Sequence, residues 1–153
     1  TSRRQRQMCI RDRRYVGYYQ TLLTHHIPFD YRHVHPSSQT EEEGARIRND
    51  ILKEEDPPTA IFCANDCTAL GVLRSLNKCR RKNYLPSVIA IDNIRKSAKT
   101  SPMLTTIDIP KQELAHFALL LLLDQQKKAH KECVRIELPC RLIERESCTY
   151  APC

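Results

Sequence analysis

Two polar side chains stand directly after apolar runs that are typical of buried strands. Asn65 follows the run Ala60–Ala64, and Asp92 follows the run Val88–Ile91. Ligands of parallel sheets bind beyond the carboxyl ends of the strands. An amide beside a carboxylate can hydrogen-bond the vicinal hydroxyls of a sugar, and an arginine would add a rigid fork of donors. The pattern therefore indicates a binding site for a hydroxylated small molecule at one edge of a sheet.

The same residues also fit purely structural roles. Asp66, beside Asn65, is a typical N-terminal cap for the helix predicted over Cys67–Lys78. Asp92 and Asn93 can form the turn that follows a strand. Spacing alone leaves the binding interpretation and the structural interpretation open.

The elements that would position these residues alternate between helix and strand. Apolar periodicity predicts helices over Arg14–His26, Thr40–Glu55, Cys67–Lys78 and Pro110 to about Gln126. Strands are predicted over Tyr31–His35, Ala60–Ala64, Val88–Ile91, Leu104–Ile107, Val134–Leu138 and Leu142–Arg145. This alternation predicts an α/β fold whose sheet is mostly parallel and buried, with helices flanking it.

Composition and charge exclude several classes of protein. The chain has 153 residues, of which 41% are hydrophobic and 28% charged, which predicts a soluble globular chain with a core. The longest apolar run, Phe117–Leu123, is far short of the roughly 20 residues of a membrane helix. The net charge is +7, but residues 1–13 carry +4 of it and the other 140 residues only +3. Nucleic-acid binding by this segment itself is therefore not expected.

Cysteine and glycine usage argues against an enzyme and against a metal site. The eight cysteines form no C-x-x-C pair, and Cys63 and Cys133 lie in apolar runs, where we expect buried free thiols. Only three glycines are present, so no glycine-rich phosphate loop can be built. No G-x-S-x-G motif is present either. We expect neither catalysis, nor a cofactor, nor a metal.

The segment Thr1–Arg13 differs from the rest of the chain. It has no helical or strand period that fits a core. It resembles peptides translated from sequencing-adapter DNA, so residues 1–13 are interpreted as an artefact or a disordered basic arm.

Several segments resemble, in order, the signatures of one family. Pro58–Gly71, which contains Ala64-Asn-Asp-Cys-Thr-Ala-Leu-Gly71, resembles the central signature of the LacI/GalR family of transcription regulators. The further matches are Arg14-x-x-Gly17-Tyr18, Ser87–Ile94, Ser101–Thr106 and Leu142–Cys148. The resemblance covers Arg14 to Cys148, and the ordered matches make it specific.

The resemblance implies a periplasmic-binding-protein-like fold of type I, in which two α/β subdomains hold a small effector between them. Residues 14–98 would then be the C-terminal sensor subdomain, and residues 99–138 a remnant of the N-terminal one. Residues 139–153 would form the returning strand and tail. The second subdomain is therefore expected to be incomplete.

The resemblance also implies functional residues and partners. Arg14, Asn65 and Asp92 fall on positions that contact effector, expected to be a sugar or sugar phosphate. Leu70, Leu73 and Arg74 fall where such proteins form a homodimer interface. Operator DNA would be bound only through a preceding domain, and we expect a cytoplasmic protein without membrane contact.

A transport-type sugar-binding protein of the periplasm is the alternative with the same fold. Eight cysteines argue against an oxidising compartment. The ending Leu142–Cys148 resembles that of the regulators. The sequence therefore favours the sensor part of a regulator, with a repressor of carbohydrate genes as the expected function.

Overall fold

The computed structural model describes residues 3–78, 84–127 and 133–149, with side chains from residue 13 onward. The α-helices are α1 (Arg3–Thr24), α2 (Glu41–Ile51), α3 (Asp66–Lys78) and α4 (Lys111–Gln126). The strands are β1 (Ala60–Phe62), β2 (Ser87–Asp92), β3 (Thr105–Asp108) and β4 (Arg141–Ile143). Short 3-10 helices span Tyr31–His33 and Arg95–Ala98.

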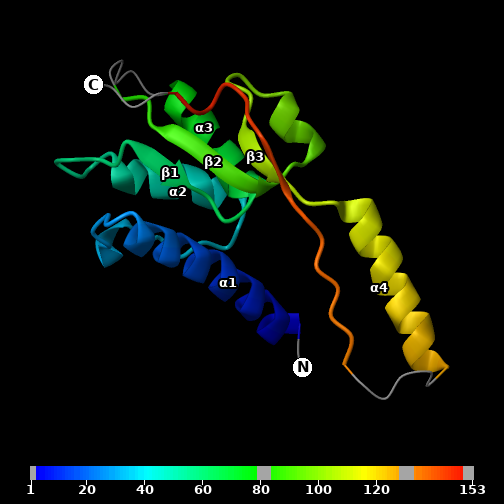
Figure 1. The fold of residues 1–153 in the computed structure, drawn as a ribbon. Helices are drawn as coiled ribbons and strands as arrows, with labels where there is room; N and C mark the ends of the chain where they lie inside the picture. The colour runs from blue at the N-terminus through cyan, green and yellow to red at the C-terminus, as the bar shows by residue number, and fades with distance from the viewer. Residues whose placement is uncertain (1–2, 79–83, 128–132, 150–153) are drawn as a thin grey trace.

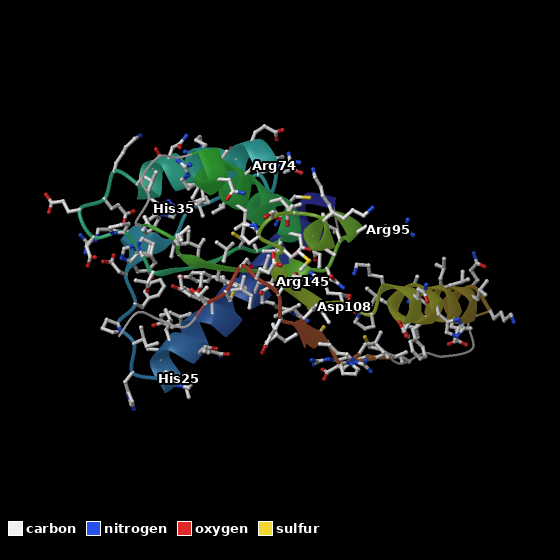
Figure 2. All side chains as sticks on the ribbon, turned by 90° about the horizontal axis from the view of Figure 1, so that it is seen from above. His25, His35, Arg74, Arg95, Asp108 and Arg145 are labelled. Carbon is white, nitrogen blue, oxygen red and sulfur yellow. The ribbon has the colours of Figure 1, made fainter. Side chains whose placement is uncertain are left out.

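The four strands form one sheet in the order β1-β2-β3-β4. The first three are parallel, with Ile61 opposite Val88 and Ile89 opposite Thr105, whereas β4 runs antiparallel to β3. The helices α2 and α3 lie on one face of this sheet and α1 lies on the other (Figures 1 and 2). The predicted α/β class with a mostly parallel sheet and flanking helices is confirmed.

The core lies between α3 and the centre of the sheet. Its buried members come from α3, from β2 and from the segments that flank them: Cys63, Ala69, Leu70, Val72, Leu73, Val88, Ala90 and Leu104. Buried residues therefore occupy the α3 face toward the sheet, as the apolar period of that helix predicts. This packing fixes the carboxyl ends of β1 and β2 relative to each other.

The two helices on this face approach closely at two glycines. A Cβ on Gly44 would overlap the carbonyl group of Thr68, and a Cβ on Gly71 would overlap that of Glu41. The side chain of Thr40 caps α2 by accepting a 3.2 Å hydrogen bond from the amide of Glu43, as its sequence predicts. Glycine at these crossing points is therefore a packing requirement, because only a missing Cβ permits the observed distance between α2 and α3.

Two elements differ from the sequence-based expectation near the N-terminus. The first helix begins at Arg3 and not at Arg14, so the backbone of residues 3–13 continues the helix. The segment Tyr31–His33 is a 3-10 turn and not a strand. Its cause is local, because Asp30 accepts hydrogen bonds from the amide and the guanidinium of Arg32, and this bonding stabilises a turn over an extended chain.

The predicted strand Val134–Leu138 is also not formed. These residues are extended but pair with no strand among the described residues, and the side chains of Val134 and Ile136 are exposed. A strand needs a neighbour to satisfy its backbone groups. The same exposure corrects the expectation for Cys133, which is exposed, whereas Cys63 is buried as predicted.

Helix α4 and the extended chain that follows it project from the sheet (Figure 1). All sixteen residues of α4 are described, and none of them is buried. Its exposed apolar side chains are Leu114, Leu119, Leu120, Leu122 and Leu123. Among the described helices, none is both long and apolar enough to cross a bilayer.

Candidate functional site

Arg14 and Asp92, which are 78 positions apart, meet at the carboxyl-terminal edge of the sheet. The Nη2 atom of Arg14 lies 3.2 Å from Oδ1 of Asp92, and its Nη1 donates to the carbonyl oxygen of Ala64. The two side chains are 20% and 29% exposed. The structure therefore joins α1, the end of β1 and the end of β2 through one partly exposed ion pair.

An aromatic stack holds α1 in the position that this ion pair needs. Tyr18 lies one helical turn after Arg14, and its ring stacks on that of Phe62 in β1, with centroids 6.1 Å apart. Residues four apart share one face of a helix, so the stack and the ion pair lie on the same side of α1. Tyr18 was not predicted as a functional residue, and its spacing from Arg14 was the available signal.

The carboxylate of Asp92 is held in an unusual environment. Burial raises the pKa of Asp92 above its ordinary value, and the charge of Arg14 opposes that rise. The backbone there is strained as well, because Asp92 has a φ of 130° and Asn93 a φ of 50°. Two consecutive residues with positive φ cost about 1–3 kcal/mol each, and such strain gathers at binding sites.

Asn65 lies at the same edge, where it caps α3. Its Oδ1 accepts a 3.0 Å hydrogen bond from the amide of Thr68, and its Nδ2 donates to the carbonyl oxygen of Gln39 at 3.2 Å. The prediction that Asp66 is the cap is therefore wrong. One hydrogen of the Asn65 amide is left over from these two bonds, so a ligand contact is compatible with the capping role.

Asp66 has a different role, which sequence reasoning missed. Its carboxylate is fully buried and accepts hydrogen bonds from the amide of Ile94, at 2.9 Å, and from the hydroxyls of Ser97 and Thr106, both at 2.5 Å. Three donors compensate a buried charge far better than one. Asp66 thus ties the start of α3 to β3 and to the loop that follows Asp92.

The residues expected at a dimer interface do not share one surface. Leu70 and Leu73 are 0% and 4% exposed because they form the core between α3 and the sheet. The fold of the chain itself therefore buries both side chains, and a homodimer contact at this helix stays a prediction. Arg74 is exposed and pairs with Glu41 at the start of α2. Figure 2 shows Arg74 on the outer side of the helical pair.

A separate hollow of about 270 Å³ lies where α4 leaves the sheet. Asp108, Pro110, Glu113, Leu138, Pro139 and Arg141 line it. The lining contains none of the three predicted site residues. The Arg14–Asp92 pair therefore lies outside this hollow, on an open edge of the sheet.

Proteins of known family resemble this chain in sequence. A model of the periplasmic binding protein-like domain matches residues 2–148. The HTH-type transcriptional repressor PurR of Photorhabdus laumondii is 34% identical over 140 residues, which are 91% of this chain and 41% of that repressor.

Solved structures of LacI-type regulators resemble this chain in fold. A LacI family transcriptional regulator from Enterococcus faecium with bound ribose is 32% identical, with a TM-score of 0.70. A LacI-type transcription regulator from Bifidobacterium animalis subsp. lactis is 26% identical, with a TM-score of 0.77. The matches cover 86% and 90% of this chain and 49% and 50% of those chains.

The chain belongs to the family of periplasmic binding protein-like domains. Within that family it is of the LacI/GalR type, as the sequence signatures predict. It spans about two fifths of the length of the curated repressor that it matches.

Proposed function

We propose that this chain is part of the effector-sensing portion of a LacI/GalR-type transcription repressor. In this proposal a small molecule binds at the edge formed by Arg14, Asn65 and Asp92. The observation that carries it is the ion pair between Arg14 and Asp92 at the carboxyl ends of β1 and β2. That edge is where parallel α/β sheets bind ligands.

The charge of the site favours a neutral sugar over a sugar phosphate. Arg14 is already neutralised by Asp92, and the neighbouring Lys111 lies 3.5 Å from the carboxylate of Asp108. A phosphate would gain most from a cation that is not already paired. A hydroxylated ring, in contrast, can donate to the partly exposed Asp92 carboxylate and accept from Arg14. The bound ribose of the Enterococcus faecium regulator supports this ligand class.

The sensing mechanism follows from linkage. A ligand shifts an equilibrium between two conformations only if it binds them with different affinity. In the complete protein, effector at this edge would change the setting of residues 14–98 relative to residues 99–138, with residues 139–153 returning to the first part. The DNA-binding heads of a homodimer would respond, and the exposed Arg74 side of α3 is the surface offered for that dimer.

The transport-type alternative has less support. The relatives that match this chain are named as repressors and regulators. Those names also support a function without catalysis, and a cytoplasmic location where DNA is accessible. A periplasmic binding protein would share the fold but would not account for the ordered signatures of the regulators.

A thermal-shift panel tests the proposal. The full chain would be heated with D-ribose, cellobiose, D-glucose and ribose 5-phosphate, each at several concentrations. We expect at least one neutral sugar to raise the Tm of the wild type and of the control Arg95→Gln, an exposed position beyond the site. The shift should vanish in Asp92→Asn. A stronger shift with ribose 5-phosphate than with ribose would overturn the neutral-sugar assignment. A shift that survives in Asp92→Asn would overturn the site.

A further inference from the structure

The side chain of Asn93, the neighbour of Asp92, bridges two distant segments. Its Nδ2 donates a 2.9 Å hydrogen bond to Oδ1 of Asp108 at the end of β3. Its Oδ1 accepts a 2.8 Å hydrogen bond from Nη2 of Arg145, which follows β4. Figure 2 shows Asp108 and Arg145 close together where the chain leaves the sheet toward α4. Both ends of the amide are therefore used across 15 and 52 positions.

The backbone of Asn93 is fixed by the same neighbours. Its amide donates to Oγ1 of Thr106 at 3.3 Å, and its carbonyl oxygen lies 3.5 Å from Nζ of Lys111 in the first turn of α4. These contacts surround the two positive φ angles at Asp92 and Asn93. Strained backbone persists only where its surroundings hold it. Asn93 makes all of these contacts, through its backbone and its side chain.

Arg145 is anchored independently of Asn93. Its Nη1 donates to the carbonyl oxygen of Leu104 at 2.7 Å, and its own amide donates to Oγ1 of Thr105 at 2.9 Å. A guanidinium fixed on one nitrogen presents the other in a set direction, because the group is planar and rigid. Arg145 therefore presents Nη2 to Asn93 from a position set by β3.

The two bridged segments are those that connect the projecting part of the chain to the sheet. One runs from Asp108 at the end of β3 into α4, and the other returns through β4 to Arg145. We propose that Asn93 and Arg145 form a latch that positions the Asp92 carboxylate and links it to both connecting segments. The role of the latch in sensing effector rests on the proposed function, whereas its hydrogen bonds do not depend on that function.

The latch gives the site a mechanical consequence. In this proposal, a ligand that draws the Asp92 carboxylate in a new direction also shifts the strained turn at residues 92 and 93. That turn carries the hydrogen bonds to Asp108 and Arg145, so the setting of both connecting segments changes with it. Coupling of this kind needs a physical element that both sites bias, and the Asn93 amide is that element. Asn93 and Arg145 are positioning residues, since they act on the ligand through Asp92.

Three substitutions separate the latch from the turn itself. Asn93→Gly keeps the positive φ without strain and removes only the side-chain bonds, because glycine adopts this conformation readily. Asn93→Ala removes the bonds and strains the turn. Arg145→Gln removes the guanidinium, and its matched control is Arg95→Gln, which removes an exposed guanidinium just beyond the turn. Amide hydrogen exchange of the full chain gives the readout without any ligand.

The latch predicts faster exchange at both of its ends. In Asn93→Gly and Arg145→Gln the backbone amides of residues 93 and 114 should exchange about tenfold faster, once corrected for the intrinsic rate of the residue present, while those of Val72 and Ala90 in the core keep their rates. The double variant should show the same exchange rates as either single variant, because both substitutions break the same hydrogen bond between residues 93 and 145. Arg95→Gln should match the wild type. Wild-type exchange in Asn93→Gly, or an equal rise at the core amides, would overturn the latch.

A second measurement separates the latch from the proposed function. D-ribose is titrated calorimetrically into the wild type, Asp92→Asn and Asn93→Gly. If ribose binds and Asp92→Asn abolishes binding, the latch predicts about tenfold weaker binding by Asn93→Gly, and unchanged affinity would contradict its positioning role. Unchanged binding by Asp92→Asn contradicts the proposed site alone. The exchange measurement decides the latch in either case.

Discussion

The hydroxyl of Thr106 donates a 2.5 Å hydrogen bond to Oδ1 of Asp66 and thereby joins the centre of β3 to the first residue of α3. Both side chains are fully buried. The same carboxylate accepts from Ser97 and from the amide of Ile94. The position of the loop that follows Asp92 therefore depends on one buried acid.

Removal of this acid should destabilise the whole fold. Asp66→Ala leaves two buried hydroxyl donors and the part-buried amide of Ile94 without an acceptor, so we expect a loss of about 3 kcal/mol or more in the free energy of unfolding. Thr106→Val keeps the shape but removes both the donor to Asp66 and the acceptor of the Asn93 amide, so it should cost about 1–2 kcal/mol. Urea unfolding measures both, with the exposed Thr24→Val as the control. Equal stability of Thr106→Val and Thr24→Val would contradict the role given to Asp66.

The close approach of α2 and α3 makes a second prediction. Gly44→Ala and Gly71→Ala each place a Cβ into a backbone carbonyl of the other helix, so each should cost about 1–3 kcal/mol. Gly17→Ala in α1 is the matched control, because its Cβ would meet no atom within 4 Å. Alanine is the better helix former, so the control should stabilise α1 by about 0.5–1 kcal/mol. Similar Tm changes for all three variants would contradict the packing described.

Asn65 can be tested for two roles with one substitution. Asn65→Asp keeps an oxygen that accepts from the amide of Thr68, so the cap remains, but it replaces the Nδ2 donor to Gln39 by an acceptor facing a carbonyl oxygen, so stability should fall by about 1–2 kcal/mol. It removes the Nδ2 donor, so affinity for a sugar should fall about tenfold. Thermal unfolding and calorimetry with D-ribose measure the two effects separately. A large loss of stability with unchanged affinity would limit Asn65 to capping.

The raised pKa of Asp92 makes a prediction about stability and pH. Because burial raises its pKa in the folded state, folding disfavours the charged carboxylate, and the wild type is penalised above that pKa. Asp92→Asn should therefore be more stable than the wild type near pH 7 while losing ligand. The difference should shrink as the pH falls through the folded pKa toward the ordinary value of about 4. Urea titrations at pH 7 and pH 4 check the sign, and a wild type that is more stable at pH 7 would contradict it.

Much of the fold was predictable because periodicity and local signals agreed. The strands at Ile61 and Val88, the helix with Leu70 and Leu73 inward and the cap at Thr40 all follow from side-chain patterns that packing reinforces. The strand predicted over Val134–Leu138 failed because an apolar pattern cannot supply a neighbouring strand. The strand predicted over Tyr31–His35 failed because the local hydrogen bonds of Asp30 favour a 3-10 turn at Tyr31–His33.

The site was predictable only in part. Resemblance to the regulators named Arg14 and Asp92, and the structure places them in one ion pair. Neither Asn93 nor Arg145 was predicted as a site residue, because their contact spans 52 positions and no local spacing indicates it. Leu70 and Leu73 fall by resemblance at a homodimer interface, whereas the apolar period of their helix predicts the burial that the structure shows. The apolar period of a helix indicates that a face is buried, but it does not indicate whether that face packs against the same chain or against a second copy.

We propose above that Asp92 binds the effector of a transcription repressor. The most direct test of this proposal is calorimetry of the complete protein and its Asp92→Ala variant with the sugar that gives the largest thermal shift, with DNA binding by both as the control for folding. The account predicts that affinity for the sugar falls about 10- to 100-fold in the variant while DNA binding persists. Retained sugar affinity in Asp92→Ala would contradict it.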